Sequence, residues 1–235
     1  MFFMGGYYLV RRGDLSPSLG SGILPSSFIS VSPHISEVIP DSWILGWGDD
    51  PASDEYRQLL GLNQSQFEEL QIQFNKHFQR HEFGFPNVFL SLDLARKFFR
   101  TFSEHLSQFC LLGVALHEEN LDSFIEEHRP ASDIGEAGVR RKLRAQEPVS
   151  QSRKIRGYEV LGFDGAAFCS FVCNSLQKDY QQELEIDFNP NGLISDYDEA
   201  KLAARYTMRD DVGAEPYSWY PWLILEYSLE NLGSG

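Results

Sequence analysis

The chain has 235 residues, 42% hydrophobic and 14% aromatic, which is enough apolar material for a sizeable core and argues against disorder. It contains 20 Lys and Arg residues and 34 Asp and Glu residues, which gives a formal net charge of −14. An acidic surface repels phosphate, so we expect no nucleic acid and no membrane as partner, and a basic protein is favoured instead. The same charge also fits a protein that is acidic only for the sake of solubility.

The chain has three cysteines, Cys110, Cys169 and Cys173. Such a small and odd number does not indicate a disulfide framework. Cys169 and Cys173 lie in an apolar stretch without a nearby histidine, which is typical of buried free thiols and not of a zinc site. The first residues lack the basic and then apolar order of a signal peptide, and no apolar run is long enough for a membrane span. We therefore expect a cytoplasmic protein with no metal and no cofactor.

The first elements in chain order are short. Residues 5–12 predict a strand, and a connector rich in Ser, Pro and Gly follows over residues 16–27. Further short strands are predicted at 28–31 and 43–47.

Two amphipathic helices come next. Residues 65–81 carry an apolar stripe at three- and four-residue spacing, formed by Phe67, Leu70, Phe74 and Phe78. Ser91 predicts the N-cap of a second helix, whose stripe is Leu94, Phe98, Phe102 and Leu106.

A continuous apolar run at 109–116 predicts a buried central strand. Asn120 then predicts the N-cap of a helix that reaches His128. Residues 129–156 are polar, and seven of the basic residues lie between 140 and 156, with Glu147 as the only acidic residue among them. This stretch predicts an exposed linker or long loop, open to proteolytic nicking.

The last third predicts a strand at 158–163 and a helix from Ala166 to Tyr180. The sequence after it predicts a short strand at 184–188, a turn at Asn189–Gly192, a helix capped by Ser195 or Asp196, and a final aromatic strand at 219–227.

The sum of these elements is an α+β fold, in which a mixed or antiparallel sheet is packed by several amphipathic helices. The chain divides into an N-terminal half (1–130), the basic loop or linker (131–156) and a C-terminal half (157–235). The alternative is one continuous domain that contains a long loop.

The candidate chemistry is weak. His77 and His81 have the spacing of two zinc ligands, but they continue an aromatic stripe and lack a general-base Glu, so packing is favoured over metal. Ser170 lacks the glycines of a nucleophile elbow. A hydrolase or transferase would have to assemble its site from scattered residues, first among them Glu159, Asp164, His117 and Ser170.

The C-terminal aromatic block offers interface anchors, although a docked terminal strand also needs such residues in the core. The interface candidates are Glu159, Asp164, Glu215, Trp219 and Trp222.

Four segments of the last third carry a resemblance to a known group of proteins. They are residues 157–164 (GYEVLGFD), Phe168-Cys169-Ser170-Phe171, Asn191-Gly192-Leu193-Ile194, and Ala214-Glu215-Pro216 before Trp219. The chain resembles uncharacterised bacterial proteins of the polymorphic and contact-dependent toxin immunity type, over roughly residues 155–227. The resemblance implies a small acidic α+β protein that covers the basic active site of a toxin, and it implies no catalytic residue.

We therefore expect an acidic protein-binding module that occludes a basic partner. A dispersed hydrolase or transferase site is the alternative, and a homo-oligomer built on the Trp219–Trp222 face is a further one.

Overall fold

The computed structural model describes residues 1–11, 22–39, 57–58, 61–79, 83–84, 88–101, 108–130, 137–149, 153–165 and 167–229. The predicted strand at 43–47 lies outside these residues. So do His81, the first half of the connector at 16–27, and the second half of the helix stripe that begins at Ser91.

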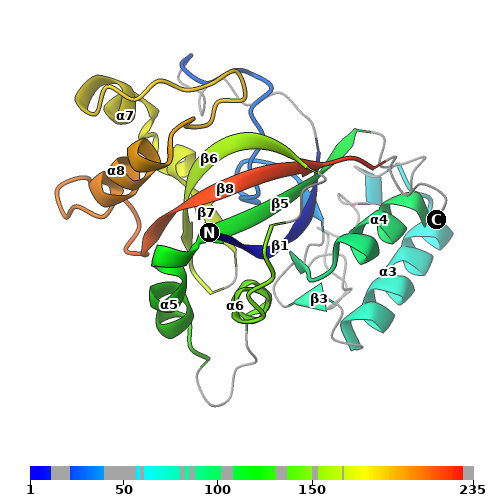
Figure 1. Cartoon of the computed structure of the whole chain (residues 1–235). Helices are drawn as coiled ribbons and strands as arrows, with labels where there is room; N and C mark the ends of the chain where they lie inside the picture. Colours follow the sequence, from blue (N-terminus) through cyan, green and yellow to red (C-terminus); the bar gives the residue numbers. More distant parts are fainter. Residues whose placement is uncertain are drawn as a thin grey trace.

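One antiparallel sheet forms the centre of the molecule (Figure 1). Its order is β3-β4-β1-β5-β8-β6-β7, and β2 also pairs with β1. The strands are β1 (Phe2–Arg11), β2 (Val38–Ile39), β3 (Phe83–Gly84), β4 (Val88–Phe89), β5 (Phe109–His117), β6 (Lys154–Phe163), β7 (Phe168–Ser170) and β8 (Trp219–Tyr227). Because the C-terminal strand β8 lies between β5 and β6, strands from before and after residues 131–156 share this sheet.

Six helices of the described residues pack around the sheet, which confirms the α+β class. They are α3 (Gln64–Gln79), α4 (Leu92–Thr101), α5 (Glu118–Glu127), α6 (Gly138–Arg144), α7 (Gln177–Glu183) and α8 (Tyr197–Thr207). Helices α3 and α4 lie on one side of the curled sheet, and α7 and α8 lie on the other (Figure 1). No helix of the described ranges has both the length and the apolar character needed to cross a bilayer.

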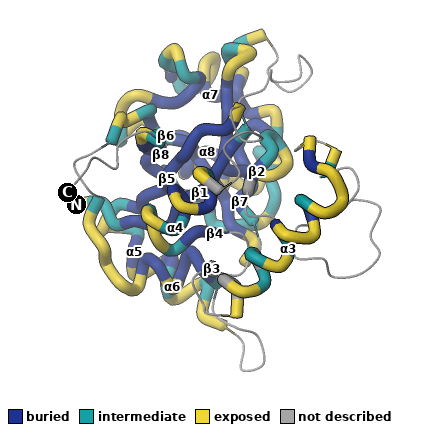
Figure 2. The backbone as a smooth tube through the Cα atoms, turned by 90° about the vertical axis from the view of Figure 1, so that its right-hand side faces the viewer, coloured by how far each residue is buried: buried dark blue, intermediate teal, exposed yellow. Residues whose placement is uncertain are grey.

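The strand alternation separates two apolar clusters. Along β5, Cys110, Leu112 and Val114 belong to one cluster, whereas Leu111 and Ala115 belong to the other. A strand buried on both faces explains the unbroken apolar run of the sequence, so the predicted central strand is confirmed. Figure 2 shows the buried strands at the centre and α3 largely exposed at the periphery.

The segment at 28–31 is not a strand, contrary to the prediction. It is buried, but its polar groups bond to serine side chains: the Ser30 amide donates to Ser36 Oγ at 3.0 Å, and the Ser32 amide donates to Ser30 Oγ at 3.0 Å. Serine hydroxyls that satisfy nearby backbone groups compete with a strand ladder.

The predicted helix from Ala166 to Tyr180 is also wrong. Asp164 and Gly165 turn the chain into the short strand β7, and a 3-10 helix, η2 (Phe171–Asn174), follows before α7. Gly165 adopts φ +90°, a backbone conformation that residues with a side chain rarely adopt. The Ala167 amide donates to Asp164 Oδ1 at 2.6 Å. These two features are typical of a tight hairpin and outweigh the apolar spacing of the segment.

Two boundaries and one short element differ from the prediction. The helix predicted to begin at Asn120 begins at Glu118, because His117 Nδ1 accepts the Glu119 amide hydrogen at 3.4 Å and caps it. Residues 184–188 form no strand beyond an isolated bridge from Phe188 to Ile194. The turn at Asn189–Gly192, the Asp196 cap and the final strand at 219–227 are as predicted.

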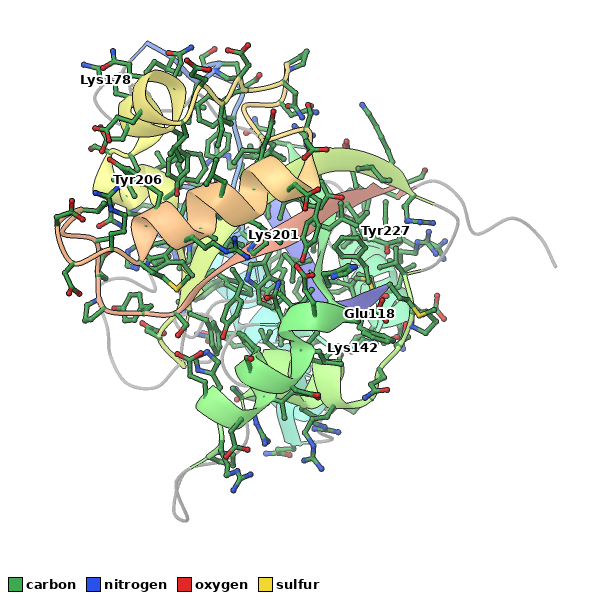
Figure 3. All side chains as sticks on the ribbon, turned by 60° about the vertical axis from the view of Figure 1, so that its left-hand side comes forward. Glu118, Lys142, Lys178, Lys201, Tyr206 and Tyr227 are labelled. Carbon is green, nitrogen blue, oxygen red and sulfur yellow. The ribbon has the colours of Figure 1, made fainter. Side chains whose placement is uncertain are left out.

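The part of the basic stretch from Gly138 to Arg144 is a docked helix and not an exposed loop, whereas residues 145–148 are exposed. In α6, Arg140 and Lys142 are buried. Arg140 Nε donates to the Ile125 carbonyl at 2.7 Å, and Lys142 pairs with Glu147 and lies over the Tyr7 ring at 5.5 Å from its centroid (Lys142 is labelled in Figure 3). Charged heads that find partners allow their aliphatic stems to be buried, which composition alone does not reveal.

Candidate functional site

A pocket of about 520 Å³ opens beside the β6–β7 hairpin. Three parts of the chain meet there: the segment after Ser32, the hairpin with β7 and η2, and the loop before β8. The lining residues are His34, Ile35, Asp164, Ala167, Phe168, Cys169, Cys173, Glu215 and Tyr217. Pockets of this size hold a small ligand or a single inserted side chain.

Asp164 and Glu215 are the two carboxylates of the lining. Asp164 is exposed on the hairpin turn, where its Oδ1 atom bonds to the Ala167 amide. Glu215 is held by its backbone, because the Glu215 carbonyl accepts from the Tyr217 amide at 2.7 Å and from Trp219 Nε1 at 3.1 Å. Its Oε2 atom is buried and has no hydrogen-bond partner among the described residues.

The pocket also holds two thiols. Cys169 is buried at the centre of β7, and Cys173 is half-buried in η2. A hydrogen bond from the Cys169 thiol lowers the pKa of Cys173, and the Ser32 hydroxyl, whose Oγ lies 3.9 Å from Cys173 Sγ, acts in the same direction. The same contact and burial raise the pKa of Cys169, so Cys173 is the thiol that ionises first.

Glu159 lies behind the pocket and connects its walls. The carboxylate is fully buried, and its Oε1 atom accepts from Ser30 Oγ at 2.5 Å and from Ser170 Oγ at 2.7 Å. Burial raises the pKa of Glu159 to about 8, although the two hydroxyl bonds act against it. Since Ser170 Oγ also caps η2 by accepting the Val172 amide hydrogen, Glu159 positions both the serine segment and the turn that carries the cysteines.

The charges of the lining favour a cation. Two carboxylates and a thiol disposed to ionise face one space, and no Lys or Arg of the described residues lines it. Tyr217 adds an aromatic ring, which attracts cations to its face. The described residues contain no group of three His, Cys, Asp or Glu side chains that could hold a metal ion.

Three of the five predicted interface residues are not at the surface. Glu159 and Trp222 are fully buried, and Trp219 is 1% exposed. Trp222 packs edge-on against Phe168 and Phe124, at centroid distances of 4.9 and 5.3 Å, so the aromatic block belongs to the core and offers no homo-oligomer face. Asp164 and Glu215 remain, and the fold brings them together in the pocket.

The four suspects for a dispersed catalytic site do not converge. Glu159 and Ser170 contact each other, but both are fully buried. His117 lies on the other face of the sheet: Glu159 is in register with Trp222, and Trp222 with Leu116, so the next residue, His117, points the opposite way.

The described contacts of His117 hold the fold together and do not form a catalytic site. Its ring packs against those of Phe2 and Tyr197, at centroid distances of 4.8 and 4.7 Å. The amino group of Met1 donates to Glu118 beside it, and Lys201 pairs with Glu119 at 3.4 Å (Glu118 and Lys201 are labelled in Figure 3). Burial and the charge of the N-terminus lower the pKa of His117.

Sequence reasoning missed most of the pocket. The sequence indicates buried packing residues at Cys169 and Cys173, and His34 and Tyr217 carry no local signal. The side chain of His77 lies outside the described residues, as does His81.

Comparison with known proteins identifies no relative, because no protein-family model, no curated protein and no solved structure matches the chain.

Proposed function

We propose that this protein is an acidic protein-binding module that covers a basic surface of its partner, and that the pocket beside the β6–β7 hairpin receives a Lys or Arg side chain from that partner. The observation that carries the proposal is the carboxylate pair of Asp164 and Glu215 in a pocket that no Lys or Arg of the described part of the chain lines. Glu215 Oε2 is buried and accepts from no donor within the ranges that the structure describes, and such an oxygen gains most from a cationic donor.

The rest of the molecule supports attraction at longer range. The chain carries a net charge of −14, so a basic partner is drawn to it before contact and is oriented by the field. The resemblance to toxin immunity proteins supplies a class of partner: a toxin whose active site is basic and is blocked when a protein covers it. Binding would neutralise such a toxin by occlusion and would require no reaction.

An affinity capture from the native host tests this proposal. The double variant Asp164→Asn/Glu215→Gln removes both pocket charges and keeps the hairpin bond, since an Asn oxygen also accepts from the Ala167 amide. The matched control is Asp122→Asn/Glu199→Gln, which removes the same charge from exposed positions on α5 and α8.

We expect the wild type and the control to retain one basic protein, and the pocket variant to lose it. Loss of one carboxylate partner from a charged hydrogen bond costs about 1.5–3 kcal/mol, so the pocket variant should bind at least about tenfold more weakly. Equal retention by the pocket variant and the control would show that only the overall charge matters. Recovery of no basic protein would contradict the proposal as a whole.

A further inference from the structure

The two pocket thiols differ in a way that suits them for successive steps. Both are free and both line the same space, whereas the third cysteine, Cys110, is buried in the core and donates to the Val10 carbonyl at 3.4 Å. Cys173 is the more accessible of the pair, and it lies four residues after Cys169 in the chain.

The neighbours of the pair are polar. Ser32 Oγ lies 3.9 Å from Cys173 Sγ, and His34, Asp164 and Glu215 line the same pocket. Cys110, by contrast, belongs to the apolar core and does not line the pocket.

We propose that Cys173 and Cys169 form a thiol–disulfide exchange site whose substrates are small disulfides that carry positive charge. Cys173 is the attacking thiol, Cys169 is the resolving thiol, and the carboxylates of Asp164 and Glu215 select the charge of the substrate. This inference does not depend on a protein partner.

The first step is an attack by the Cys173 thiolate on one sulfur of the disulfide. The bond between Cys173 and that sulfur forms, the disulfide bond of the substrate breaks, and its electron pair leaves on the other sulfur, which takes a proton from solvent. The product is a mixed disulfide at Cys173.

The second step follows from the first. Once Cys173 carries no negative charge, the contact that raises the pKa of Cys169 most is lost, while burial and Glu215 still raise it. Cys169 therefore releases its proton to solvent as it attacks. The Cys169 thiolate attacks the Cys173 sulfur, and the second half of the substrate leaves as a thiolate. Overall, two protein thiols are oxidised to one disulfide, and the substrate disulfide is reduced to two thiols.

The purified wild-type chain and neutral dithiodipyridine test the chemistry, because each cleavage releases one coloured thiopyridone. We expect about two thiopyridones per chain in the fast phase, and a product that mass spectrometry shows without an adduct. Cys169→Ser should release about one and retain an adduct, Cys173→Ser should lose the fast phase, and Cys110→Ser should behave as the wild type.

The selectivity is tested with cystamine, a dication, against dithiodipropionate, a dianion of similar length. Cystamine should react at least about tenfold faster, and the Asp164→Asn/Glu215→Gln variant should remove most of this preference. Equal rates for the two disulfides would overturn the charge selection.

The exchange itself would be overturned by a wild-type product that keeps its adduct, or by a fast phase that survives in Cys173→Ser. Circular dichroism of each variant shows whether it is folded. If a variant is not, limited alkylation of the wild type with iodoacetamide and peptide mapping give the same answer: the Cys173 peptide must be labelled first, and prior labelling of Cys169 or Cys110 would contradict the assignment.

Discussion

Replacement of Glu159 by Gln should make the stability of the fold less dependent on pH. The carboxyl of Glu159 is fully buried, and its pKa rises from 4.5 to about 8 on folding. The folded state therefore binds more protons than the unfolded state between these two values. The stabilising contribution of Glu159 is fully present below pH 4.5 and is lost as the pH rises through 8.

The size of the effect follows from the same two values. Each pH unit between 4.5 and 8 lowers the free energy of unfolding by about 1.4 kcal/mol, with rounding at both ends, so the wild type should lose roughly 3 to 4 kcal/mol between pH 5 and pH 8 through this group. In Glu159→Gln the amide oxygen still accepts from Ser30 and Ser170, and nothing titrates. Any fixed cost of the amide cancels in the comparison of two pH values.

Urea unfolding at pH 5, 6, 7 and 8, monitored by tryptophan fluorescence, measures the free energy of unfolding of the wild type and of Glu159→Gln. Between pH 5 and pH 8, the free energy of unfolding of Glu159→Gln should rise relative to that of the wild type by roughly the same 3 to 4 kcal/mol. The control, Glu199→Gln on the exposed surface of α8, should differ from the wild type by no more than about 0.5 kcal/mol at every pH. A difference between Glu159→Gln and the wild type that stays constant from pH 5 to pH 8 would refute the account of this carboxyl.

Two further predictions concern the fold. Gly157 has φ +137° at a bulge in β6, and an added Cβ would lie 2.8 Å from the Ile194 carbonyl oxygen, so Gly157→Ala should cost about 3 kcal/mol or more in urea unfolding. Gly213→Ala, at φ +74° with nothing within 4 Å, should cost only about 1 kcal/mol, and equal losses would show that the close contacts do not matter. Trypsin should not cleave after Arg140 or Lys142 in the native protein because both side chains are buried in α6, whereas Arg141 and Arg144 are exposed. Rapid cleavage after Arg140 or Lys142 in a chain that remains folded would contradict the docking of α6.

The sequence predicts elements well where one physical signal dominates. The apolar run at Phe109–Leu116 is stable only as a strand that is covered on both faces, and it forms β5 in the structure. The block at 219–227 is β8 over its whole length, because aromatic and β-branched residues favour a strand and Asp and Gly residues end the segment before it.

Prediction fails where local polar bonds outweigh spacing. Phe168, Phe171 and Val172 have helical spacing, but the hairpin at Asp164 and the Ser170 cap divide the segment into a strand and a 3-10 helix. In α6 the basic residues suggest exposure, and only the tertiary partners of Arg140 and Lys142 explain their burial.

The candidate site could be predicted only in part. Asp164 and Glu215 are both among the interface candidates of the sequence, yet they lie 51 positions apart and nothing in their spacing shows that they meet. The sequence predicts Glu159 at an interface, because strand alternation assigns the residue to a face of the sheet but does not reveal what covers that face. The serine segment at 30–36, which forms no regular element, supplies that cover.

The dissociation constant of the captured basic partner, measured with purified proteins over a range of salt concentrations, tests the central claim most directly. The account predicts that Asp164→Asn/Glu215→Gln weakens binding at least about tenfold more than Asp122→Asn/Glu199→Gln, and that the gap persists at high salt, because a charge inserted into a pocket is screened less than one at the surface. If the two variants weaken binding equally, and both effects vanish as salt is added, the pocket is not where the partner docks.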